Sequence, residues 1–146
     1  MDMENAYLAA ARRLDFAASE ITHRLKALLS CQEGELTGIQ FFTLRLLSRE
    51  GQMKVTDIAA CLGVTLSAIT GLINRLYKLG LVTREQDEAD RRIVWIKLTQ
   101  KGQDLINDLN EKRAQLLAQI LQDLPPEEFA KLEQLLNYIY ERLAKQ

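Results

Sequence analysis

Side chains that build disulfides and metal sites are scarce in this sequence. Its 146 residues include two cysteines, Cys31 and Cys61, and a single histidine, His23. Two cysteines this far apart fit neither a disulfide framework nor a zinc ribbon, and one imidazole excludes a site with several histidine ligands. We therefore expect no metal and no cofactor. The two thiols are interpreted as incidental or buried, with redox regulation through Cys61 as the alternative.

Long apolar runs and catalytic motifs are also missing. No stretch approaches the roughly 18 consecutive apolar residues of a membrane-spanning helix. The polar start from Met1 to Asn5 lacks the basic and apolar regions of a secretory signal. The sequence contains no Gly-rich phosphate loop, no HExxH, no Gly-x-Ser-x-Gly and no cluster of cysteine and histidine. We therefore expect a cytoplasmic protein that is not an enzyme and has no membrane partner.

The composition itself is typical of a folded globular domain. Apolar residues make up 47% and charged residues 27%, and the formal net charge is −1. That mean conceals an asymmetry, because residues 51–102 hold eight basic and five acidic side chains, a net charge of +3, whereas the rest of the chain carries −4. The sequence therefore predicts a basic central lobe flanked by acidic arms.

Apolar residues at helical spacing predict long helices at both ends of the chain. A first helix is broken by Gly34, and a second begins at the capping box formed by Thr37 and Gln40 and ends near Gly51. A long helix follows Thr99, and the last helix begins after a proline pair. The apolar stripes of the first helix and the last two are Leu14, Ala18, Ile21, Leu25 and Leu28; Leu105, Leu109, Leu116, Ile120 and Leu124; and Phe129, Leu132, Leu136, Ile139 and Leu143.

Two short helices are expected in the middle of the chain. The first covers 56–62 with Thr56 as its N-cap, and a tight turn from Gly63 to Thr65 ends in a second N-cap. The next helix covers 66–79. Two short helices joined by a turn that contains glycine form a helix-turn-helix, whose second helix enters the major groove of DNA.

A hairpin follows these helices. Residues 81–85 and 93–98 are strand-like runs on either side of a polar tip at 86–92. We expect a two-stranded sheet that forms the wing of a winged helix-turn-helix. The predicted fold is mainly α, of the α+β class, with N- and C-terminal helices around that lobe.

The helix over 66–79 has one apolar and one polar face. At 100° per residue its apolar arc is formed by Ile69, Leu72, Ile73 and Leu76. The opposite arc and its flanks carry the candidate DNA-binding residues Ser67, Thr70, Gly71, Asn74, Arg75 and Lys78. Small polar side chains on this face can exchange hydrogen bonds with base edges, and the cations can reach phosphates. A glycine within a helix indicates close approach of a partner to the backbone. The alternative is an ordinary solvated amphipathic helix.

Two adjacent arginines at the hairpin tip complete the candidate interface. In a regular strand Arg91 and Arg92 point to opposite faces, so one of them can enter the minor groove, whose negative potential attracts arginine. Asp87 and Asp90 oppose this unless one of them pairs with an arginine and holds it in place. A merely solvated hairpin is the alternative.

At this point the chain resembles the MarR family of transcriptional regulators, over about residues 36–102. The motifs are DIAACLGVT at 57–65, ITGLINRL at 69–76, GLVTR at 80–84, Asp87, DRR at 90–92 and LTQKG at 98–102. The resemblance implies one MarR-like domain over 1–146. Within it, 36–102 is the DNA-binding lobe, and 1–35 with 103–146 is a helical dimerisation region. It also implies DNA contacts from Ser67, Thr70, Asn74 and Arg75, with Arg91 or Arg92 in the wing. Glu88 departs from the proline that the family often has.

The resulting hypothesis is a homodimeric regulator of transcription that binds a pseudo-palindromic stretch of double-stranded DNA and acts as a repressor. The apolar stripes support a dimer independently, because they exceed what one small lobe can cover, although packing within one chain is the alternative. The resemblance suggests a small aromatic or anionic effector, and Trp95 is either part of its cleft or an exposed or core side chain. The rival function is a winged-helix module that binds protein without specific DNA binding.

Overall fold

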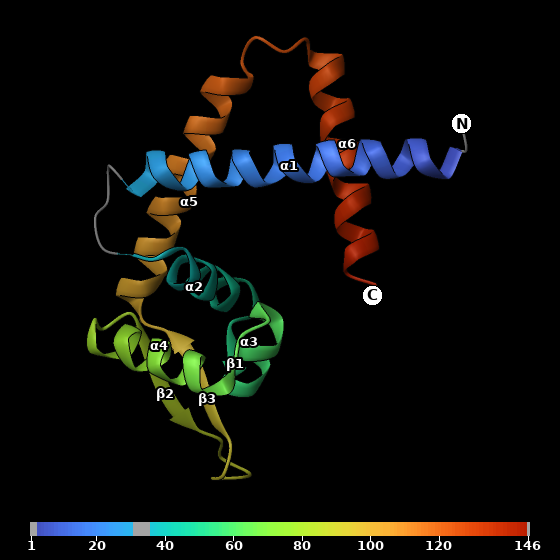
Figure 1. Cartoon of the computed structure of the whole chain (residues 1–146). Coiled ribbons are helices and arrows are strands. Elements are labelled where there is room, and N and C mark those ends of the chain that lie inside the picture. Colours follow the sequence, from blue (N-terminus) through green and yellow to red (C-terminus); the bar gives the residue numbers. More distant parts are fainter. Residues whose placement is uncertain (1–2, 31–35, 146) are drawn as a thin grey trace. The chain divides into compact units, whose positions relative to one another are not determined.

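The computed structural model describes residues 3–30 and 36–145. It is mainly helical, in agreement with the predicted class (Figure 1). The elements are α1 (Met3–Ser30), α2 (Gly38–Glu50), β1 (Gln52–Lys54), α3 (Val55–Leu62), α4 (Leu66–Lys78), β2 (Val82–Gln86), β3 (Val94–Leu98), α5 (Gln100–Leu121) and α6 (Pro126–Leu143). The chain divides into two compact units, 1–110 and 111–146, each of which is described by itself. Cys31 lies outside the described residues.

The sheet has one more strand than the sequence predicts. It is antiparallel, with the order β1-β3-β2, so β3 lies in the middle. The hairpin of β2 and β3 is confirmed, with Val82 opposite Leu98 and Gln86 opposite Val94, and its tip extends beyond α3 and α4 in Figure 1. The prediction of a two-stranded sheet is wrong, because β1 pairs with the other edge of β3. A run of three residues is too short to show the alternation that identifies a strand.

Local hydrogen bonds set where the central helices begin. The Thr37 hydroxyl accepts from the Gln40 amide, and the Gln40 side chain accepts from the Thr37 amide at 2.8 Å, so the predicted capping box is confirmed. The Thr65 hydroxyl accepts from the Ala68 amide at 3.2 Å, as expected of an N-cap. The predicted N-cap at Thr56 is wrong. The N-cap is Lys54, two residues earlier, so α3 begins at Val55, and the Lys54 backbone is already extended as the end of β1.

The core joins the helices of the lobe to the sheet. All four residues of the predicted apolar arc of α4 are buried, and Ile69, Ile73 and Leu76 have no exposed surface. The other core side chains are Leu44, Leu47, Ile58, Ala59, Leu81, Val82, Ile96 and Ile106. Because α4 contributes a whole face to this core, the opposite face of α4 must point outward.

The start of α5 is bound tightly to the turn between α4 and β2. The Thr99 hydroxyl donates to the carbonyl of Gly80 at 2.6 Å and accepts from the amide of Gly102 at 3.0 Å. The Thr99 amide donates to the carbonyl of Leu81 at 3.0 Å. An added Cβ at Gly102 would lie 2.1 Å from that carbonyl oxygen of Leu81. Only glycine permits the two backbones to approach this closely.

Helices α1 and α6 carry large apolar side chains outside the core. Leu25 is the one buried residue among the described side chains of α1, and α6 has none. Among the described helices, none is by itself long and apolar enough to cross a membrane. Helices α3 and α4 meet that test only when they are taken together across a bend of 113°.

Replacement of Gly102 by alanine is expected to lower the free energy of unfolding by about 1–3 kcal/mol, because the added methyl group overlaps a backbone carbonyl that cannot move freely. The matched control is Gly71→Ala in α4, where nothing lies within 4 Å of an added Cβ. That change should raise stability by about 1 kcal/mol through helix propensity. Urea denaturation of both variants measures the difference, and equal stability of the two would contradict the close approach at Gly102.

Candidate nucleic-acid interface

The polar face of α4 is open to solvent, as its apolar arc requires. Five of its six predicted DNA-binding residues are exposed, namely Ser67, Thr70, Asn74, Arg75 and Lys78. The sixth, Gly71, is half-buried, and an added Cβ there would meet open space. The Thr70 hydroxyl donates to the Leu66 carbonyl at 2.8 Å, so it offers an outside partner its acceptor lone pairs.

Sequence reasoning missed one residue on this surface. Arg84 of β2 reaches across to α4, where its Nη2 donates to Oδ1 of Asn74. Its guanidinium carbon also lies 5.2 Å from the centre of the Tyr77 ring, a cation–π contact. Arg84 ends the GLVTR motif at 80–84, but nothing in the sequence predicts its contact with Asn74.

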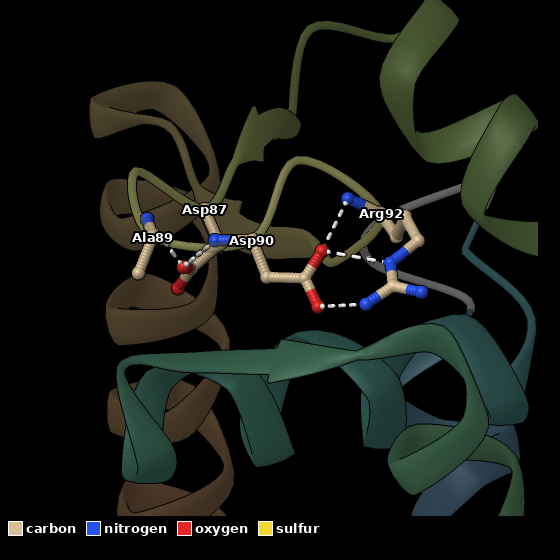
Figure 2. Close-up of polar contacts among 4 residues, drawn as sticks. All are labelled: Asp87, Ala89, Asp90 and Arg92. Carbon is tan, nitrogen blue, oxygen red and sulfur yellow. Dashed lines mark hydrogen bonds and ion pairs between the residues drawn. The ribbon is translucent and has the colours of Figure 1, made fainter.

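The wing tip is held by two aspartates. Figure 2 shows the Asp87 carboxylate facing the backbone of Ala89 and Asp90, whose amides donate to Oδ1 at 2.9 and 3.0 Å. It also shows Asp90 and Arg92 facing each other through a bidentate pair, with Nε and Nη2 donating at 3.0 and 3.1 Å. The hydrogen bonds from the Arg92 side chain and amide lower the pKa of Asp90. The predicted pairing of an aspartate with an arginine at the tip is therefore confirmed for Asp90 and Arg92.

The expected strand geometry of the two arginines is wrong. Arg91 and Arg92 lie in a turn before β3, since the Ile93 amide donates to the Asp90 carbonyl at 2.9 Å. The Arg92 side chain stays 92% exposed despite its pair with Asp90. Turn residues are not bound to opposite faces of a strand, so Arg91 can project from the tip while Arg92 is paired with Asp90.

Trp95 anchors the wing tip to the sheet. Its indole Nε1 donates to Oδ2 of Asp87 at 2.8 Å, and the ammonium of Lys54 lies 5.4 Å from the ring centre. The hydrogen bond from Trp95, with those from the amides of Asp90 and Ala89, lowers the pKa of Asp87. Trp95 is half-buried, and its polar end is occupied within the wing. This contact links β1, β3 and the tip, and neither strand pattern nor motif predicts it.

Within the basic segment 51–102, three cations form no side-chain hydrogen bond, ion pair or cation–π contact in the described part of the chain: Arg75 and Lys78 on α4, and Arg91 at the wing tip. The other basic side chains that could compete for an anion are engaged. Lys97 pairs with Glu85, and Lys101 donates to the Leu79 carbonyl at 2.9 Å. The unpaired positive charge therefore gathers on α4 and at the tip.

A separate groove of about 490 Å³ lies between α1, α2 and α3. It is lined by Ser19, Thr22, His23, Lys26, Gly38, Ile39, Phe42 and Leu62. Cationic and polar groups come from α1, whereas the apolar groups come from α2 and α3. Trp95, a candidate for the effector cleft on sequence grounds, does not line this groove.

The thiol of Cys61 is free and exposed.

The geometry agrees with the comparison to known proteins. The model of the MarR family matches residues 36–94. This chain belongs to the MarR family. A MarR family protein from Bacillus stearothermophilus has the same fold over 99% of both chains, with a TM-score of 0.86 and 26% identity.

Two relatives from Bacillus subtilis match the central part of this MarR family chain. The HTH-type transcriptional regulator YfiV is 43% identical over 89 residues, 61% of this chain and 56% of the relative. The HTH-type transcriptional repressor MdtR is 32% identical over 99 residues, 68% of this chain and 64% of the relative. The matched stretch thus spans less than two thirds of either relative.

The hydrogen bond between Trp95 and Asp87 is expected to depend on pH. Because the folded protein lowers the pKa of Asp87 below its usual 3.8, the bond is present above that value and is lost as pH falls through the lower, folded pKa. The chain has one tryptophan, so a single indole N–H resonance in the NMR spectrum reports this bond without assignment. We expect its chemical shift to titrate with a midpoint below 3.8.

The control for this titration is Asp87→Asn, which keeps an acceptor oxygen and removes the ionisable group. In that variant the indole resonance should lose its acid transition. A midpoint at or above 3.8 in the unaltered protein would show that the carboxylate is not stabilised by this contact in solution.

Proposed function

We propose that this protein is a transcriptional regulator that binds double-stranded DNA with sequence specificity. The observation that carries the proposal is the exposed polar face of α4 beside unpaired cations. Arg75, Lys78 and Arg91 have no side-chain partner among the described residues. A protein-binding surface is instead expected to present large apolar or aromatic anchors.

The residues of this surface divide by chemistry. Ser67, Thr70 and Asn74 carry groups that exchange hydrogen bonds with base edges, and Arg75 and Lys78 carry charges for phosphates. Gly71 leaves room for close approach to the helix backbone. At the wing, Asp90 holds the Arg92 guanidinium in a fixed pose, which supports insertion into a narrow minor groove, and Arg91 can neutralise a neighbouring phosphate.

We propose that the protein represses transcription. A dimer seated on an operator excludes other proteins from that stretch of DNA, and a related protein, MdtR, carries the name of a repressor. The site of action would be the bacterial cytoplasm, where the chromosome lies. The alternative remains a winged-helix module that binds protein.

The test is fluorescence-anisotropy binding to duplex DNA from upstream of the protein's own gene, with a scrambled duplex as competitor. We expect binding that resists the competitor and falls steeply with salt. Lys78→Ala should weaken binding to all duplexes alike and lower the salt slope by about one unit. The control Lys131→Ala removes the same charge from α6, outside the lobe, and should leave the slope unchanged. Binding that is flat with salt would favour the protein-binding module.

A homodimer is the proposed assembly. The large apolar side chains of α6 are exposed in the single chain, including Phe129, Leu136 and Ile139, and α1 exposes others such as Leu14 and Phe16. Each such side chain contributes about 1.5–3 kcal/mol when it is fully buried. A second copy of the chain is the simplest cover. Two recognition helices about 34–36 Å apart would then read half-sites roughly 10 base pairs apart.

Replacement of Leu136 by glutamate tests the dimer. A charge buried in an apolar interface without a partner is costly, so we expect the dissociation constant of the dimer to rise at least about tenfold. The control Gln134→Glu adds the same charge to the polar face of α6, where it should have no effect. Light scattering over a range of concentrations measures the mass. A monomeric parent protein, or equal dimerisation of both variants, would contradict the proposal.

The groove between α1, α2 and α3 is the proposed effector site. Lys26 and His23 suit an anionic group, and Ile39 and Phe42 suit an aromatic body. An effector changes DNA binding only if its affinity differs between the DNA-competent form and the other form. In the same anisotropy measurement, benzoate, a small aromatic carboxylate, is expected to lower affinity for the duplex. An unchanged affinity at saturating benzoate would contradict this site.

A further inference from the structure

The contact between α4 and β2 bears on which base the recognition helix reads. We propose that Arg84 is a positioning residue that sets the base preference of Asn74, because its bond to the amide oxygen turns that oxygen toward β2 and presents the nitrogen donors to DNA. The inference rests on the proposed function, since it concerns the specificity of the same surface. It predicts a preference for guanine over adenine at the base that Asn74 contacts.

The orientation of the Asn74 amide follows from the chemistry of its partner. All five N–H groups of a guanidinium are donors and none of its atoms accepts. The atom of Asn74 that meets Arg84 Nη2 must therefore be the oxygen. The amide nitrogen, with its two donors, is left for an outside partner.

Arg84 is itself held in place from a second side. Its guanidinium carbon lies 5.2 Å from the centre of the Tyr77 ring, and Tyr77 follows Asn74 by three positions, so both lie on neighbouring parts of the α4 surface. Arg84 comes from a strand that is paired along its whole length with β3. The amide of Asn74 is thus oriented by a side chain with a fixed backbone and a stacked head group.

This orientation separates the two purines. An asparagine reads adenine bidentately when its oxygen accepts from N6 and its nitrogen donates to N7. Guanine presents O6 and N7, which are both acceptors, to the same side of the groove. With the oxygen turned to Arg84, the two donors of Asn74 match the two acceptors of guanine. Adenine would place its N6 donor against them.

The experiment begins with selection from a random duplex library by the full-length protein, followed by the same selection with Asn74→Ala to locate the base pair that Asn74 reads. Dissociation constants are then measured for all four base pairs at that position. The variants are Arg84→Met, which removes the donors but keeps a flexible side chain beside Tyr77, and Arg75→Ala. Arg75 is an exposed arginine of the same helix without a side-chain partner among the described residues, so it controls for charge.

The parent protein should prefer guanine, and Arg84→Met should shift the ratio of guanine to adenine affinity by roughly tenfold toward adenine. Arg75→Ala should weaken all four duplexes alike. A parent preference for adenine, or a uniform loss in Arg84→Met like that of Arg75→Ala, would overturn the role of Arg84 and leave the proposed function intact. A parent protein that enriches no sequence would overturn the proposed function, and this inference with it.

Discussion

Burial of one face of α4 is the constraint on which the rest of the lobe depends. Ile69, Ile73 and Leu76 have no exposed surface, so the helix can rotate only at the cost of moving large apolar side chains into water. The orientation of the polar face is fixed by the same packing. Packing of the apolar face in the core therefore fixes the direction in which the candidate DNA-binding side chains point.

The wing is built as an extension of that core. Its middle strand contributes the buried Ile96, and the base of the hairpin is tied to α5 where Gly102 meets the carbonyl of Leu81. At the far end, Asp87 joins the tip to Trp95, and Asp90 engages Arg92. The contacts at the far end stiffen the hairpin itself, and the bond from Arg84 to Asn74 ties the hairpin to α4. A rigid wing lowers the entropy lost when helix and tip bind one ligand together.

Charge is distributed unevenly, because residues 51–102 carry a net +3 although the whole protein carries −1. Acidic groups within the wing are used locally: Asp87 accepts three hydrogen bonds and Glu85 pairs with Lys97. Arg75, Lys78 and Arg91 keep no such partner among the described residues. Arg84 is also engaged within the lobe, because its guanidinium contacts Asn74 and Tyr77. Polar contacts inside the lobe thus decide which groups remain available to an outside partner.

The sequence by itself determined the features that depend on neighbours along the chain. The capping box of Thr37 and Gln40, the N-cap at Thr65 and the apolar arc of α4 follow from fixed spacings, because helix geometry relates such residues locally. Tertiary structure decided the rest. The pairing of β1 with β3, the bond from Trp95 to Asp87 and the contact of Arg84 with Asn74 join segments whose relative placement depends on how the whole core packs. Spacing carries no information about such contacts, and for that reason the motif that contains Arg84 does not predict its bond to Asn74.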